Sequence, residues 1–290
     1  MKKRCFIFFI VFFIFNFYFF SCSSQPKNAG EINNLRKQVE AGLITANREA
    51  AMGRFSSALS LLTEHKRNAI LADDPSLIIR VSLSRGNILF SLGRISEAYT
   101  EWDEAVAEAV RFGNDELLSV ARIFYARGNL LSGRVSAEST LDIVNRESLN
   151  IKKDRLYIAF ASQVKGFTLR TLGRWNEAEI EIRKSLDIHQ KDRHLENASY
   201  DWYIIASIRS LSGNFTGALE ALDSSIALDR RIENSWGLAA SWRAMGDVYV
   251  RAGRNTDAKE SYLRSRAIYD AMRHDQEVIE LDIKIKELSN

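Results

Sequence analysis

The fold of this chain is decided by a stretch near its middle, Gly166-Phe167-Thr168-Leu169-Arg170-Thr171-Leu172-Gly173-Arg174-Trp175-Asn176-Glu177-Ala178. Its second glycine belongs to a series with a strict period of 40 residues and no insertion or deletion: Gly53, Gly93, Gly133, Gly173, Gly213 and Gly253. The chain of 290 residues contains 15 glycines. Six of them in one phase indicate an internal repeat, not an effect of composition.

Small residues flank each of these glycines at two fixed distances. Seven residues before it stand Ala46, Gly86, Ala126, Gly166, Ala206 and Gly246, and five residues after it stand Ala58, Ala98, Glu138, Ala178, Ala218 and Ala258. A glycine directly after a periodic apolar segment typically ends a helix in the left-handed conformation. Small residues on both sides then let two antiparallel helices approach closely. Bulky residues four positions further on should fill the groove to the neighbouring pair: Leu62, Trp102, Ile182, Leu222 and Tyr262.

This pattern resembles the tetratricopeptide repeat, a helix–turn–helix unit with small residues at its helix crossings and a glycine between the helices. The match covers residues 37–273, and Leu172 to Ala178 is close to the core motif of the family. The usual unit has about 34 residues, so a period of 40 implies longer helices. The third unit departs most, with Glu138 and Asn145 where small residues belong. An array of HEAT-like repeats is a distant alternative.

The fold class expected from this resemblance is all-α. It is a right-handed superhelical solenoid of six hairpins over residues 33–273, followed by a capping helix within residues 274–290. The capping helix is expected because Val278, Leu281 and Ile285 recur among charged residues, and an uncapped solenoid would expose its core. Prolines are limited to Pro26 and Pro75, which suits a continuous run of helices.

The N-terminus reads as a targeting segment. Lys2, Lys3 and Arg4 precede an apolar run that ends at Ser21-Cys22; the run is short for a membrane-spanning helix and fits a signal peptide. The junction resembles the lipobox of bacterial lipoproteins, which implies a signal peptide over 1–21, lipidation of Cys22, a flexible tether over 22–32, and an exported, membrane-anchored protein facing the periplasm or the cell surface. The alternative is an uncleaved N-terminal anchor.

Charge and composition argue against several function classes. The formal net charge is +3, but 37 basic residues face 37 acidic ones once Lys2, Lys3 and Arg4 are set aside, so no nucleic-acid partner is expected. The four histidines show no metal-ligand spacing and are expected at the surface: His65, His189, His194 and His274. No catalytic constellation is recognisable, and no cofactor, metal or enzymatic activity is predicted.

The resemblance implies that the first helix of each unit lines a concave groove. Counting back from each turn glycine places an aromatic and arginine-rich set there. Arginine and aromatic residues are common binding hot spots, although rings in solenoids are often core. Asn47 and Asn87, at equivalent positions, are similar to the asparagines with which some family members grip a peptide; the lysine that completes that grip is replaced by Leu43, and a local hydrogen bond is the alternative. The candidate groove residues are Asn47, Asn87, Arg127, Phe160, Phe167, Arg170, Tyr200, Tyr203 and Arg243.

The sequence therefore favours a non-enzymatic, membrane-tethered scaffold that binds a protein or peptide partner in the groove, with a role in cell-envelope assembly. A second hypothesis is a small-ligand-binding accessory component of a transport system, with the central aromatic residues forming a closed pocket.

Overall fold

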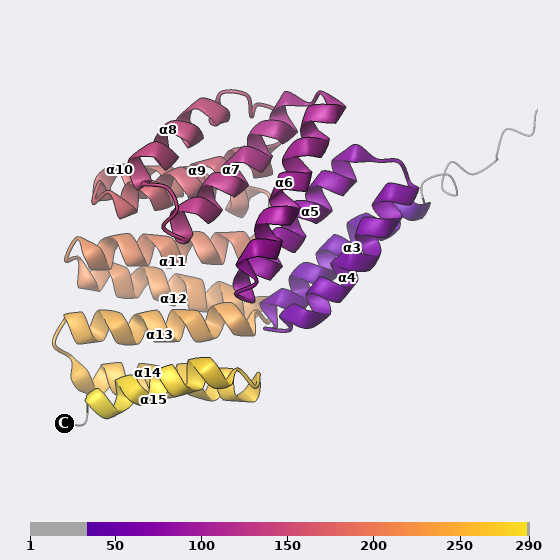
Figure 1. Ribbon diagram of the computed structural model, residues 1–290. Helices are drawn as coiled ribbons and strands as arrows, with labels where there is room; N and C mark the ends of the chain where they lie inside the picture. Colours follow the sequence, from indigo (N-terminus) through magenta and orange to yellow (C-terminus); the bar gives the residue numbers. More distant parts are fainter. Residues whose placement is uncertain (1–33, 289–290) are drawn as a thin grey trace, which may run out of the picture. The chain divides into compact units, whose positions relative to one another are not determined.

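A computed structural model describes residues 34–288, and throughout this part the secondary structure is helical (Figure 1). The expected signal peptide and tether lie outside the described residues. The thirteen helices are α3 (Asn34–Ala51), α4 (Phe55–Leu71), α5 (Pro75–Ser91), α6 (Ile95–Phe112), α7 (Asp115–Leu131), α8 (Ala137–Ser148), α9 (Arg155–Thr171), α10 (Trp175–Lys191), α11 (Leu195–Leu211), α12 (Phe215–Arg231), α13 (Ser235–Arg251), α14 (Asn255–Ala271) and α15 (Asp275–Glu287).

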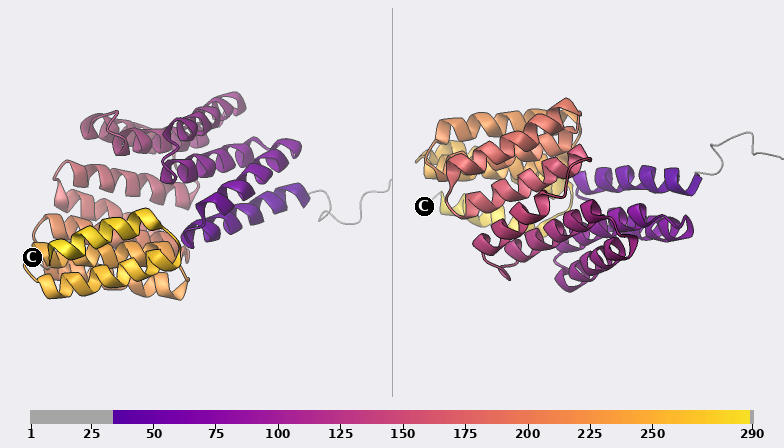
Figure 2. Two further views of the ribbon diagram at one scale, coloured as in Figure 1. Left: turned by 60° about the horizontal axis from the view of Figure 1, so that its bottom comes forward. Right: turned by 90° about the horizontal axis from the view of Figure 1, so that it is seen from above.

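The helices pack as consecutive hairpins. From α4 onward each helix packs against the next one in the chain, and the first helices α5, α7, α9, α11 and α13 also contact one another in order. Figure 2 shows these successive layers from two further sides. α15 covers the last hairpin, since its Leu281 is fully buried in one cluster with Tyr262 and Ala239. The predicted all-α solenoid of hairpins with a C-terminal capping helix is confirmed.

The repeat glycines end the first helix of each hairpin as predicted. At Gly93, for example, φ is 73°, and the N–H groups of Gly93 and Arg94 donate to the carbonyl oxygens of Phe90 and Leu89 at 3.0 and 2.9 Å. The same left-handed conformation recurs between hairpins, halfway along the period, where four of the five residues with positive φ have side chains: Asp73, Gly113, Arg193, Glu233 and Arg273. The geometric repeat is thus about 20 residues, and glycine marks every second turn.

Left-handed conformation disfavours residues with a Cβ by about 1 kcal/mol. Arg193 has φ of 60° and an exposed side chain. Replacing it by glycine is therefore expected to raise the free energy of unfolding by about 1 kcal/mol. Gly213→Ala is the matched control, because nothing lies within 4 Å of the added Cβ and only backbone strain changes. It should lower stability by a similar amount. Urea unfolding followed by circular dichroism measures both, and equal signs for the two variants would contradict the turn assignment.

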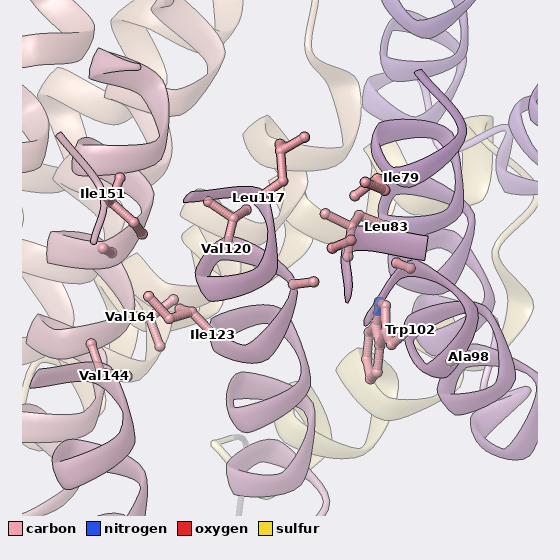
Figure 3. Close-up of a cluster of buried hydrophobic side chains, with 14 of the residues drawn as sticks. Ile79, Leu83, Ala98, Trp102, Leu117, Val120, Ile123, Val144, Ile151 and Val164 are labelled. Atoms are coloured by element: carbon pink, nitrogen blue, oxygen red, sulfur yellow. The ribbon is translucent and has the colours of Figure 1, made fainter. Parts of the chain in front are cut away.

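The bulky residues predicted to fill the inter-helix grooves are buried in the core. Trp102 is 1% exposed, and its indole lies between two glycines of different hairpins, Gly86 on α5 and Gly128 on α7. Figure 3 shows Trp102 beside Ala98 and Leu83 in this cluster, with Ile123 and Val164 further along it. The slot between these glycines connects two neighbouring repeats.

The third hairpin is irregular, at the unit whose sequence departs from the pattern. Its second helix α8 has 12 residues, whereas the other hairpin helices have 17 or 18. The missing turns are replaced by a loop after Ser148, and Glu116 holds this loop by accepting the backbone N–H groups of Lys152 and Lys153 at 2.8 Å. Asp154 then caps α9 by accepting from the Leu156 N–H at 2.8 Å.

Candidate functional site

A central cavity of about 630 Å³ is surrounded by the first helices of all six hairpins, α3, α5, α7, α9, α11 and α13. It crosses these helices obliquely. The C-terminal halves of α3, α5 and α7 line it on one side, and the N-terminal halves of α9, α11 and α13 line it on the other. Groove-facing positions therefore shift along the helices from one repeat to the next.

Six of the nine candidate groove residues line this cavity: Asn47, Asn87, Arg127, Phe160, Tyr200 and Tyr203. The other three do not. Arg170 lies over the Phe167 ring at 4.4 Å and donates to Ser207 Oγ at 2.7 Å, while Arg243 pairs with Glu280 of the capping helix at 2.8 Å. The nine residues were predicted from the same distances before each turn glycine. The cavity crosses the helices obliquely, so a position that lines it in one hairpin does not line it in another.

The perimeter of the cavity is closed by a contact between the two ends of the array. We call Phe55, Trp236, Tyr269 and His274 the closing cluster. The Phe55 ring meets the Trp236 ring edge-on at 4.8 Å, and His274 Nε2 donates to the carbonyl oxygen of Gly53 at 2.9 Å. The turn of the first hairpin thus contacts the start of α13 and the turn that precedes α15, and Figure 1 shows the start of α4 close to the start of α13. These partners lie 221 residues apart, and the repeat pattern gives no sign of the contact.

Two polar groups on the cavity wall lack partners. The Arg127 side chain, half-buried, forms no hydrogen bond or ion pair with any residue between 34 and 288 that the structure describes. Asn87 Oδ1 is buried and likewise accepts no hydrogen bond within that range. This oxygen therefore takes part in no local hydrogen bond within residues 34–288. Phe124 on α7 and Phe160 on α9 also line the cavity, and their rings stack at 4.1 Å.

Sequence reasoning missed the acidic groups of the cavity. Glu196 stands in the first turn of α11 and Asp229 in the last turn of α12, both on the cavity wall. Neither stands at an offset counted as groove-facing, and Asp229 belongs to a second helix. The sequence does contain a sign that Asp229 is buried, because this acid lies within the apolar pattern of α12, close to Ile226 and Leu228.

The expectation that all four histidines lie at the surface is wrong for His189. This side chain is 1% exposed, and its Nδ1 lies 2.6 Å from Oδ2 of the buried Asp201. Ser185 Oγ lies 3.3 Å from the same nitrogen, and Gln163 donates to Asp201 at 2.8 Å. Because serine and aspartate share one imidazole nitrogen and all three are buried, the arrangement is a structural network and presents no nucleophile. It orients Gln163, whose side chain lines the cavity.

No group of three or more histidine, cysteine, aspartate and glutamate side chains among residues 34–288 is placed to hold a metal ion. None of the helices described is both long and apolar enough to cross a membrane.

Comparisons with known proteins support the fold. No protein-family model matches the chain, and no curated protein matches its sequence. Solved structures do match it. A Rap protein complexed with Competence and Sporulation Factor has 13% sequence identity and a TM-score of 0.57, over 89% of this chain and 77% of the other. BtubC from P. vanneervenii has 15% identity and a TM-score of 0.54, over 83% and 92%.

A third similar structure, from Pyrococcus horikoshii, is a signal transduction ATPase with a tetratricopeptide repeat sensor. It has 13% identity and a TM-score of 0.51, over 88% of this chain and 42% of that one. Identities this low establish architecture only. These structural similarities, together with the hairpin geometry and the left-handed turn glycines, show that the chain has the fold of the tetratricopeptide repeat proteins.

Proposed function

We propose that this protein is a non-enzymatic scaffold that binds a peptide segment of a partner in the central cavity. The observation that carries the proposal is that Arg127 and the Asn87 side-chain carbonyl, neither with a partner among residues 34–288, line the same cavity as Phe160 and Tyr200. An unpaired guanidinium fits a carboxylate, and an asparagine side chain offers a donor and an acceptor to a peptide backbone. The complex of the similar Rap protein with Competence and Sporulation Factor is consistent with such a role.

Site-specific photo-cross-linking in cells tests this function. p-Benzoylphenylalanine at Phe160 places the reactive group in the cavity, and the same residue at Ile180, 55% exposed on the outer helix α10, is the control. We expect a defined cross-linked protein from position 160 that is absent from position 180. The cross-link should also fall when Arg127→Gln is added. Identical products from both positions would contradict the proposal.

A second candidate, a small-ligand receptor serving a transport system, is favoured by the size of the cavity. A volume of about 630 Å³ falls within the range of small-molecule sites, and the closing cluster completes the perimeter. In the cross-linking experiment this alternative predicts no protein adduct at position 160. Native mass spectrometry of the purified protein would then show a retained small molecule.

The proposal extends to a lipid anchor at Cys22 and to a place in the cell envelope, on the strength of the lipobox-like junction. Replacing Cys22 by alanine is expected to move the protein from the membrane fraction to the soluble fraction and to abolish palmitate labelling. Cys5→Ala, within the expected signal peptide, is the control and should change neither result. Full membrane retention of the Cys22 variant would reject the anchor but leave the cavity proposal intact.

A further inference from the structure

Five large apolar side chains are exposed where the second helices of the first three hairpins end. They stand in the last turns of α4 and α6 and directly after α8, and each is between 46% and 71% exposed: Ile70, Leu71, Val110, Phe112 and Leu149. We call this set the apolar rim. Exposed apolar side chains that gather in this way mark a surface that binds a membrane or another protein.

Contacts between neighbouring helices hold the apolar rim on one side of the array. Arg36 at the start of α3 pairs with Asp74 at 3.0 Å, which places the start of α3 beside the turn after α4. Because α5 and α6 pack as a hairpin, the end of α6 lies beside the start of α5. Glu116 at the start of α7 accepts the backbone N–H of Lys152 at 2.8 Å and so holds the loop after α8 on the same side.

The later hairpins do not continue the apolar rim. At the positions equivalent to Ile70 and Val110, the fourth, fifth and sixth hairpins carry Gln190, Arg230 and Asp270, and all three are exposed. The repeat thus leaves this position open to solvent and does not itself require an apolar residue there. Packing within the array therefore does not explain the apolar rim.

The chain enters the array on the side of the apolar rim. α3 begins at Asn34, and Figure 1 shows the start of α3 and the turn from α4 to α5 on the same side of the array. Residues 22–33 form the expected tether. A coil of that length would average about 20 Å between its ends, which is less than the length of a hairpin helix, about 25 Å. A lipid at Cys22 would therefore hold this side of the array closer to the bilayer than the opposite side.

We propose that the apolar rim docks on the lipid bilayer that carries the anchor, with its side chains at the boundary of the headgroups and the acyl chains. This inference rests on the lipid anchor at Cys22 in the proposed function, and it specifies how the array is oriented on the membrane. Acids and bases alternate on this side, as in Lys152-Lys153-Asp154-Arg155, so burial of apolar surface and not charge provides the attraction. Neutral phosphatidylcholine is therefore a sufficient partner.

Fluorescence quenching in proteoliposomes tests this orientation. p-Azidophenylalanine replaces Val110 or, as the matched control, Gln190, which is exposed at the equivalent position of the fourth hairpin, and an alkyne derivative of the fluorophore NBD is coupled to it. The full-length protein is reconstituted in phosphatidylcholine that contains a nitroxide-labelled phospholipid. Since interfacial side chains reach about 5–10 Å into the boundary of headgroups and acyl chains, we expect the nitroxide to quench the label at position 110 at least about 2-fold more than the label at position 190. Aqueous iodide should show the opposite order.

Matched pairs of substitutions assign the quenching to the apolar rim. Leu71→Ser with Phe112→Ser should abolish the preference for position 110. Ile279→Ser with Ile283→Ser, at exposed positions of the capping helix α15, should leave it unchanged.

Three results would overturn the inference, and they separate it from the anchor. Equal nitroxide quenching at both positions, in protein that floats with the vesicles, would reject docking and leave the anchor standing. A label at position 110 that is shielded from iodide but not reached by the nitroxide would also reject docking on lipid, because a second copy of the protein would then cover the apolar rim. Protein that does not float with the vesicles would reject the anchor, and this inference with it.

Discussion

Replacing Gly86 by alanine is expected to destabilise the protein by about 2 kcal/mol, although alanine is the stronger helix former by about 1 kcal/mol. The added Cβ would lie 2.2 Å from Nε1 and 2.5 Å from Cδ1 of the Trp102 indole. The indole cannot withdraw, because a Cβ at Gly128, on its other side, would lie 2.2 Å from Cζ3. Overpacking against a rigid ring held from both sides forces the two hairpins apart. Urea unfolding followed by circular dichroism gives the free energy.

Two further variants separate this overpacking from a general intolerance of the helix. The double variant Gly86→Ala, Trp102→Leu should lose less stability than the sum of the losses of the two single variants, because the smaller leucine makes room for the added methyl group. Gly166→Ala, at the equivalent position two hairpins on, would place its Cβ 2.5 and 2.7 Å from Cδ1 and Cγ1 of Ile182 and 3.0 Å from the backbone oxygen of Ala178. The two closest atoms belong to an aliphatic side chain that can change its χ2 angle, which a rigid indole cannot do, so the loss should be smaller. A Gly86→Ala variant as stable as wild type would show that the indole does not fill the slot as described.

The repeat architecture could be predicted from the sequence because its signals are local. A glycine such as Gly173 ends its helix with φ of 72°, and Gly166 admits Ile182 seven residues before that turn; both requirements recur in every period. The turns between hairpins gave no such signal, since residues such as Glu233 adopt the left-handed conformation with a side chain. The sequence therefore shows a period of 40 residues, although left-handed turns recur in the backbone about every 20 residues.

The candidate site was only partly predictable, because it depends on how the repeats are stacked. Tyr203 was placed correctly, since a first-helix offset suffices to bring it to the inner side. Phe167 and Arg170, at first-helix offsets of the same kind, do not line the cavity, because the cavity crosses α9 nearer to its N-terminus. The contact of Phe55 with Trp236 closes the perimeter of the cavity. It depends on the rotation of each hairpin relative to the previous one, added over all the repeats, and the residue pattern of a single repeat does not predict that total.

Replacing Asp229 by asparagine is expected to stabilise the protein by about 3 kcal/mol at pH 8. The pKa of Asp229 is raised from an ordinary value near 3.8 to about 6 by burial. Because the native state holds this proton more tightly than the unfolded state, the carboxyl group lowers stability increasingly as pH rises from about 4 to about 6, and by a constant amount above that. Asparagine does not titrate, so its advantage should be largest at pH 8 and should vanish near pH 4.

The difference between wild type and variant isolates this group, because titration of the other carboxylates is common to both proteins. Glu196 is the charged neighbour whose pKa is coupled to Asp229, and repeating the pH series in a Glu196→Gln background corrects for it. Unfolding by urea at pH 4, 6 and 8 gives the curve; a constant difference across this range would remove the electrostatic argument. Stabilisation that grows from pH 4 to pH 8 would mean that the ionised Asp229 carboxylate opposes folding. A structural role predicts the reverse, because the hydrogen bond from Asn234 would then be what the carboxylate provides, and asparagine at position 229 would weaken the fold.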